Sequence, residues 1–310
     1  MADNKNNSKT LRKLPDVTFD TKCDCPVIAR SVQSNKPSPD PSTSTKGSLD
    51  EGDVAISFGG CGFLGTYQLG AVKMIHEHGK KLLERTVRFA GCSSGSLAAT
   101  VLLLCPDKLD EATENVYAVA DEINSHVFGV LKPGLIISER LRSAMDQIIP
   151  QDISKAQNKL YVSVTKLMSL ENELISTFEN RDNLIEVLLT SCHHPLYSNG
   201  IFGAKSPVLN GETYIDGGYT QLIPTFTDIP TITCSAYASD ANICPVEKSM
   251  FNDDTSCVRF MKHNMKISFS NLRRVKMSLL PPSRQELEKY FELGAEDAKN
   301  FLIDNKVYND

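Results

Sequence analysis

A serine flanked by glycines is the first residue in the chain whose setting suggests chemistry. Ser93 stands in Gly91-Cys92-Ser93-Ser94-Gly95, a G-x-S-x-G sequence that follows the apolar run Val87-Arg88-Phe89-Ala90 and precedes an apolar helical pattern. In such a sequence the serine sits in a strained turn between a strand and a helix, where small neighbours let it protrude. We therefore predict that Ser93 is a nucleophile. The alternative is that Ser93 only caps the following helix.

A glycine-rich loop precedes this serine by one strand and one helix. The segment Gly60-Cys61-Gly62-Phe63-Leu64-Gly65 fits G-x-G-x-x-G, which is also the fingerprint of dinucleotide sites. Such a site should carry Asp or Glu near the end of the second strand, whereas this strand runs into Gly91-Cys92-Ser93. The loop is better suited to an oxyanion hole, in which backbone N–H groups stabilise a developing alkoxide.

A serine nucleophile needs a base, and the candidates are aspartate and histidine. Asp216 stands in Tyr214-Ile215-Asp216-Gly217-Gly218, where its alternative role is a plain Asp-Gly turn. His263 is the only histidine after Asp216, so it alone fits the Ser-Asp-His order of α/β-hydrolases. His193 and His194 lie at a predicted helix end before a proline, where we expect them to act as C-caps. These residues alone leave the choice of base open.

Alternating strands and helices would position these groups. Short β-branched runs, such as Val54-Ala55-Ile56-Ser57-Phe58, alternate with amphipathic helical segments through most of the chain. This alternation predicts an α/β fold with a mainly parallel central sheet, covered by helices in three α/β/α layers. Residues 1–50 are polar and rich in Ser, Asn and Pro, so we expect a disordered tail there. Residues 51–310 would form one domain with a C-terminal helical extension.

Composition narrows the class of protein. The net charge of −5 and a pI near 5.7 argue against nucleic acid as a partner. Nine scattered cysteines do not suggest a disulfide scaffold, which favours a reducing cytosol. Apolar runs are far shorter than the roughly 20 residues that a membrane span needs. We expect a cytoplasmic protein that meets lipid, if at all, from the surface.

Three segments together resemble the patatin-like phospholipase family, most closely its animal branch around adipose triglyceride lipase and adiponutrin. The segments are ISFGGCGFLGTYQLGAV, FAGCSSGSLAATVLL and YIDGGYTQLIP, and the likeness extends from about Val54 to Leu302. The resemblance implies a serine–aspartate dyad without a catalytic histidine, with Ser93 as nucleophile and Asp216 as proton acceptor. Amides of Gly60, Cys61 and Gly62 would form the oxyanion hole. Gly65, Gly91, Gly95, Gly217 and Gly218 complete the motifs.

The family's known activities set the expected function. They imply an acyl hydrolase without metal or organic cofactor that cleaves neutral glycerolipids, chiefly triacylglycerol, at a lipid droplet or membrane, with a possible protein coactivator. Alternatives are a phospholipase, a retinyl esterase or an acyltransferase on the same dyad, or a weakly active regulatory protein that binds lipid droplets. The elbow departs from the G-A-S-A-G that is frequent in the family, since Cys92 and Ser94 replace alanines.

A basic segment near the C-terminus offers a possible lipid-binding surface. Residues 262–289 carry seven Lys or Arg side chains, interleaved with apolar residues such as Phe269, Leu272 and Leu279. A basic amphipathic segment of this kind can lie on a lipid surface. Because apolar stripes are common on helices of globular domains, we favour the simpler alternative that this one packs on the core.

Overall fold

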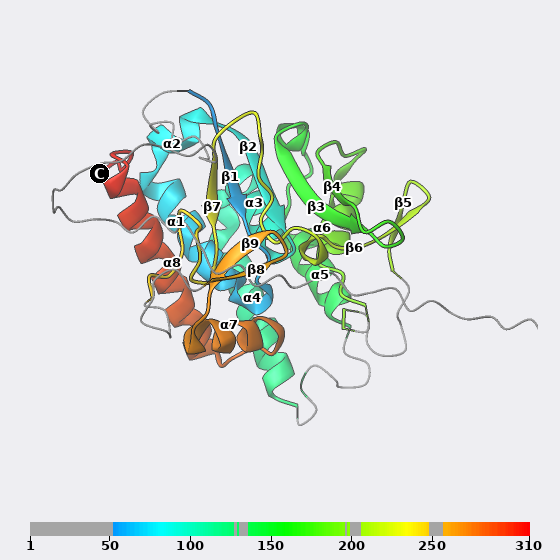
Figure 1. Ribbon diagram of the computed structural model, residues 1–310. Helices are drawn as coiled ribbons and strands as arrows, with labels where there is room; N and C mark the ends of the chain where they lie inside the picture. Colours follow the sequence, from blue (N-terminus) through cyan, green and yellow to red (C-terminus); the bar gives the residue numbers. More distant parts are fainter. Residues whose placement is uncertain (1–51, 127–128, 130–135, 196, 199–205, 248–256) are drawn as a thin grey trace, which may run out of the picture.

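A computed structural model describes residues 52–126, 129, 136–195, 197–198, 206–247 and 257–310. The tail predicted over residues 1–50 lies outside these residues. Within them the chain forms the expected α/β fold with a mainly parallel central sheet (Figure 1).

The centre of the sheet is parallel. Strands β1 (Val54–Phe58), β2 (Thr86–Cys92), β3 (Leu160–Lys166) and β7 (Thr231–Cys234) pair in the order β3-β2-β1-β7. All five residues of β1 are buried, as expected where helices cover both faces of a parallel sheet. The antiparallel edge consists of β4 (Asn172–Ile175), β5 (Val208–Leu209) and β6 (Glu212–Asp216).

Eight α-helices lie within the described residues. They are α1 (Gly65–His78), α2 (Lys80–Arg85), α3 (Ser94–Leu104), α4 (Leu109–Asn124), α5 (Ile137–Ile148), α6 (Arg181–Ser191), α7 (Phe269–Leu279) and α8 (Arg284–Asp304). A small hairpin of β8 (Cys257–Phe260) and β9 (His263–Lys266) precedes α7. Pro281 and Pro282 lie between α7 and α8.

The last helix is fixed to the first one at unusually close range, and the two lie side by side in Figure 1. A Cβ on Gly294 of α8 would lie 1.8 Å from the carbonyl oxygen of Tyr67 in α1. Likewise, a Cβ on Gly70 would lie 1.9 Å from the Phe291 carbonyl oxygen. Glycine at these two positions therefore allows the backbones to touch, and the predicted C-terminal extension is an integral part of the fold.

The local turns follow the sequence signals in one case and differ in another. Asn210 and Gly211, with φ of 49° and 83°, join β5 and β6 as an antiparallel hairpin. Asp216 also ends a strand, but it is followed by one 3₁₀ turn, Gly217–Tyr219, rather than by a returning strand. The plain hairpin role of the Asp-Gly pair is therefore wrong.

Candidate active site

Ser93 occupies the sharp turn between β2 and α3. Its backbone has φ 54° and ψ −130°, a left-handed conformation that is strained for a residue with a side chain. Neighbouring groups hold this turn, because the Ser93 amide donates to Ser191 Oγ at 2.9 Å and the Ser93 carbonyl accepts from Ser96 Oγ at 2.7 Å. The strained geometry favours the nucleophile role over a simple helix cap, since the Ser93 side chain makes no capping hydrogen bond.

The two glycines of the motif are required by close packing around this turn. A Cβ on Gly91 would lie 2.2 Å from the carbonyl oxygen of Gly95, and a Cβ on Gly95 would lie 2.2 Å from that of Phe58. Both distances are shorter than any normal contact, so the elbow closes only with glycine on each side of Ser93. The motif is thus used in the way that its spacing predicts.

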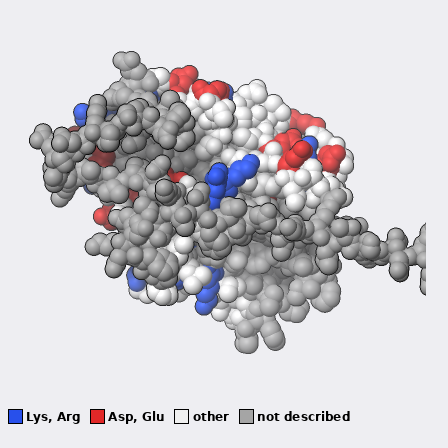
Figure 2. Space-filling view, viewed as in Figure 1, with Lys and Arg blue, Asp and Glu red and all other residues white. Residues whose placement is uncertain are grey.

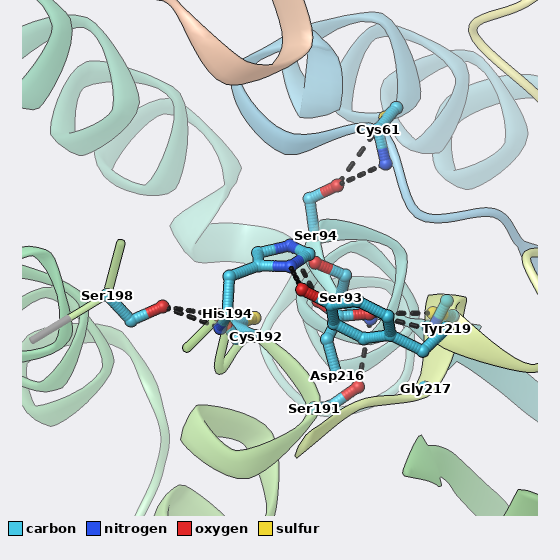
Figure 3. A network of polar contacts seen from close by, with 12 residues as sticks. Cys61, Ser93, Ser94, Ser191, Cys192, His194, Ser198, Asp216, Gly217 and Tyr219 are labelled. Atoms are coloured by element: carbon cyan, nitrogen blue, oxygen red, sulfur yellow. Dashed lines mark hydrogen bonds and ion pairs between the residues drawn. The ribbon is translucent and has the colours of Figure 1, made fainter. Parts of the chain in front are cut away.

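Strand register brings Asp216 to the same end of the sheet as Ser93. Cys92, the last residue of β2, pairs with Ser163 of β3, and the next residue, Val164, pairs with Asp216 of β6. Ser93 and Asp216 consequently line one cavity, although they lie 123 positions apart in the sequence (Figure 3). The Asp216 side chain is only 1 % exposed.

Each oxygen of the Asp216 carboxylate has a defined environment. Oδ1 accepts from the Gly218 amide at 2.7 Å and contacts the Cys92 thiol at 3.5 Å. Burial raises the pKa of Cys92, so its sulfur is a neutral thiol that donates to the carboxylate. Oδ2 is buried, and its ion-pair partner is the imidazole of His194, with Nε2 at 3.1 Å. Asp216 is therefore oriented on both sides.

His194 is the site residue that sequence reasoning missed. Helix α6 ends at Ser191 with Cys192 as its cap, and the His194 ring turns instead toward Asp216 (Figure 3). The C-cap role predicted for His194 is therefore wrong. Burial acts to lower the pKa of His194, but the hydrogen bond and charge of Asp216 outweigh it and raise the pKa above its ordinary value.

Two tyrosines complete the surroundings of this imidazole. Tyr219 Oη lies 3.4 Å from His194 Nδ1, and the ring of Tyr197 meets the imidazole edge-on at 6.2 Å between centroids. Burial and the neighbouring His194 lower the pKa of His193, so this second histidine is neutral near pH 7. The sequence signal that could have identified His194 is its position just before the segment that carries Asp216, although nothing in one sequence shows that the two side chains meet.

His263 lies elsewhere. It begins β9, and its Nδ1 pairs with Asp240 Oδ1 at 3.3 Å. It does not line the cavity that contains Ser93 and Asp216. The Ser-Asp-His order that singled it out is therefore not realised as a triad.

The glycine loop lies beside Ser93, but its amides are not equally available. Gly60 N–H donates to the Leu222 carbonyl at 3.0 Å, and Cys61 N–H donates to Ser94 Oγ at 3.1 Å. Gly62 begins a 3₁₀ turn, and a first-turn N–H group has no acceptor within the turn. Of the three predicted donors, Gly62 is thus the one most available, and Cys61 becomes available if the Ser94 hydroxyl moves away.

A long apolar cavity of about 560 Å³ extends from Ser93 between α3, α4 and α5. Its walls are mostly aliphatic, and Ser93, His194 and Asp216 are among the polar residues that line it. Of the described residues that line it, none is Lys or Arg. Aliphatic walls leading to a serine suit a substrate with a hydrocarbon chain and one reactive polar group.

Comparison with known proteins agrees with this geometry. The patatin-like phospholipase family model matches residues 56–228. Human patatin-like phospholipase domain-containing protein 4 is 38 % identical over 251 residues, which cover 81 % of this chain and 96 % of that protein. The mouse omega-hydroxyceramide transacylase is 32 % identical and covers 80 % of this chain, but the match spans only 40 % of that protein.

Two further similarities were found. The mouse 1-acylglycerol-3-phosphate O-acyltransferase Pnpla3 is 30 % identical over 82 % of this chain and 60 % of its own length. Among solved structures, VipD from Legionella pneumophila aligns with a TM-score of 0.40 and 11 % identity, over 82 % of this chain and 67 % of that one. The family match and the identity to the human relative, joined to the elbow and aspartate in one cavity, show that this chain belongs to the patatin-like phospholipase family.

Proposed function

We propose that this protein is a serine acyl hydrolase that cleaves carboxylic esters of neutral glycerolipids, chiefly triacylglycerol. The observation that carries the proposal is the strained Ser93 in one cavity with a buried, doubly oriented Asp216. Family membership supplies the general class, which includes lipid hydrolases and acyltransferases.

The mechanism follows from the two side chains. As Ser93 Oγ attacks the ester carbonyl carbon, its proton passes to the Asp216 carboxylate, and the carbonyl oxygen becomes an alkoxide. Amides of the glycine loop, Gly62 foremost, stabilise this charge together with the N-terminus of α3, which begins at Ser94. Collapse expels the alcohol, which takes the proton back from Asp216. Water then attacks the acyl-enzyme carbonyl carbon as Asp216 takes its proton. Collapse breaks the bond to Ser93 Oγ and releases the fatty acid, and the proton passes from Asp216 to Ser93 Oγ.

The cavity favours neutral lipids over phospholipids. A phosphate buried near Ser93 would need a cationic partner, but none of the described lining residues is Lys or Arg, and His194, which also lines the cavity, already pairs with Asp216. Aliphatic side chains of α3, α4 and α5, such as Leu97, Val116 and Leu141, instead suit an acyl chain. This supports a triacylglycerol or another uncharged ester.

Acyl transfer is a second candidate because two relatives are named for it, one as a transacylase and one as an acyltransferase. The chemistry is the same until the last step, in which a lipid hydroxyl replaces water as the acceptor. In either case we propose a protein that acts at a lipid droplet or membrane surface from the cytoplasm, with a protein coactivator as a possible partner. No described helix is both long and apolar enough to cross a bilayer.

A direct assay tests the proposal. Purified protein is incubated with emulsified triolein, with a phosphatidylcholine emulsion, and with triolein plus a diacylglycerol acceptor, and the products are measured by mass spectrometry. We expect release of oleate from triolein, and Asp216→Asn should lower that rate by about 10²–10⁴-fold, the usual contribution of a general base. Equal rates for the wild type, Ser93→Ala and Asp216→Asn would refute the proposal that this protein is a serine acyl hydrolase. Lipid binding without any turnover would favour the regulatory alternative.

A further inference from the structure

Helix α7 exposes its apolar face and buries polar side chains, which is the reverse of the usual arrangement for a helix of a globular domain. Phe269, Leu272, Val275 and Leu279 lie three to four residues apart and are 74, 68, 41 and 48 % exposed. The residues that α7 buries include Asn271 and Arg274. The expectation that this apolar stripe packs on the core is therefore wrong for α7.

The polar side of α7 is fixed inward by specific bonds. Asn271 accepts from the Ala238 amide at 2.9 Å and donates to the Ala238 carbonyl at 2.8 Å. Arg274 pairs with Glu247 at 2.7 Å, and both side chains are mostly buried. These bonds hold the apolar stripe outward, so its exposure is built into the fold rather than caused by loose packing.

Exposed apolar residues are concentrated on this face. Of the thirteen large exposed apolar side chains among the described residues, six belong to α7, to Leu280 directly after it or to Phe260 in the preceding hairpin. A contiguous apolar surface of this kind usually marks an interaction site.

The charge around this face indicates the partner. Residues 257–280 contain six Lys or Arg side chains and no Asp or Glu, although the whole chain has a net charge of −5. Acidic residues outside this segment balance two of the six, since the buried Arg274 pairs with Glu247 and Arg273 pairs with Glu286 of α8. Arg273 and Lys276 lie on the helix surface beside the apolar stripe, and Lys262 is exposed at the hairpin tip. In Figure 2 a group of white and blue atoms is visible at the lower left, where Figure 1 places α7. Apolar side chains with exposed cations beside them are the pattern of helices that lie in the interface of an anionic lipid surface.

The same elements also form one wall of the active-site cavity. Val275, Ser278 and Leu279 of α7, and Phe260 of the hairpin, line the cavity that contains Ser93. Val275, Leu279 and Phe260 are each more than 40 % exposed as well, so they border both the cavity and the outside. An acyl chain could thus pass from a surface in contact with α7 to Ser93 without crossing water.

We propose that the exposed face of α7, together with the tip of the β8–β9 hairpin, docks on an anionic lipid surface and delivers ester substrate to Ser93. The occupant is a lipid surface rather than a protein partner because the face is continuous with an apolar, substrate-sized cavity and has the exposed cations Lys262 and Lys276 beside it. The delivery step rests on the proposed function, whereas the docking itself does not.

The test uses the full chain and vesicles of phosphatidylcholine with and without phosphatidylserine. Phe269→Ser/Leu272→Ser removes exposed side chains that do not line the cavity. Met168→Ser/Val208→Ser, at 70 and 63 % exposure on the β3–β4 turn and on β5, is the matched control. We expect the first pair to weaken vesicle co-sedimentation at least about tenfold, from the burial that it loses, and the control to leave it unchanged.

Charge and activity supply independent readouts. Lys262→Gln/Lys276→Gln should weaken binding to phosphatidylserine vesicles by about fivefold for each cation, whereas Lys80→Gln/Lys81→Gln on α2 should not. Hydrolysis of soluble p-nitrophenyl butyrate should be the same in the wild type and in Phe269→Ser/Leu272→Ser, while hydrolysis of triolein falls with vesicle binding.

Three results would overturn the proposal: wild-type protein that does not bind vesicles, undiminished binding by Phe269→Ser/Leu272→Ser, or an equal loss on soluble ester and triolein. A protein that binds vesicles through α7 but hydrolyses no ester would refute the proposed function and leave the docking surface standing.

Discussion

Replacing His194 by glutamine tests whether this histidine orients Asp216 or is itself the catalytic base. In the neutral state, His194 Nε2–H can donate to Asp216 Oδ2 across 3.1 Å while Tyr219 Oη–H donates to Nδ1. When protonated, the imidazolium stabilises the carboxylate and opposes transfer of the Ser93 proton to it. Activity should therefore rise with pH as His194 loses its proton.

The structure sets how strongly protonation of His194 should slow acylation. Protonation adds a charge to a hydrogen bond that the neutral imidazole already makes with the carboxylate, and charge assistance roughly doubles the strength of such a bond, which adds about 1.5–3 kcal/mol. Because the His194 side chain is 33 % exposed, solvent screening reduces this added energy to about 1–2 kcal/mol. At about 1.4 kcal/mol for each tenfold, protonation of His194 should slow acylation by about 5- to 30-fold.

The assay is the pH dependence of kcat/KM on p-nitrophenyl butyrate. The pKa of His194 is raised above its ordinary value of 6.5, so the wild-type rate should increase through a pKa above 6.5. His194→Gln keeps an N–H donor but does not titrate. It should be faster than the wild type at pH 6 and within a few-fold of it at pH 9. His76→Gln, on the exposed side of α1, is the matched control.

Two results would refute this reasoning. If the wild-type rise with pH persists in His194→Gln, another group controls it. If His194→Gln is as inactive as Ser93→Ala at every pH, the imidazole is itself the base and the dyad is wrong.

Three other predictions follow from the same contacts. Ser94→Ala removes the acceptor of Cys61 N–H, so this amide becomes free to bind the oxyanion, and kcat on p-nitrophenyl butyrate should rise about threefold to tenfold. A tenfold fall in kcat would instead show that the Ser94 hydroxyl is part of the oxyanion hole. Gly294→Ala places a Cβ 1.8 Å from the Tyr67 carbonyl oxygen and should lower the free energy of unfolding by about 3 kcal/mol in urea titration, whereas the exposed Lys299→Ala should change it little. Because folding raises the pKa of His194, the contribution of protonated His194 to the free energy of unfolding is complete below about pH 6.5 and is lost as pH rises through the pKa of the folded protein. The difference in free energy of unfolding between the wild type and His194→Gln should therefore narrow from pH 5.5 to pH 8.5, and a widening difference would contradict the raised pKa.

The elbow could be predicted from sequence because its requirements are local. Gly91 and Gly95 leave space around Ser93, and the strand and helix on either side have clear patterns. The α/β fold can also be predicted from the sequence, because strands such as β1 are mostly apolar and helices such as α1 are followed by glycine.

The rest depends on contacts between distant segments. The pairing of His194 with Asp216 arises from the way the chain turns after α6, which no local pattern specifies. The loop amides of Gly60 and Cys61 find partners in Leu222 and Ser94 only once the fold has formed. The outward stripe of α7 cannot be predicted from sequence, because a helical pattern shows which residues share a face but not whether Asn271 and Arg274 find buried partners on the other side.

The central claim is that Ser93 carries the acyl group. Rapid-quench mass spectrometry during turnover of p-nitrophenyl butyrate tests it most directly, with peptide mapping to locate the modified residue. We predict one butyryl group for each chain, on Ser93, present in the wild type and absent from Ser93→Ala. Turnover with no acylated protein, or with the acyl group on another residue, would contradict the account.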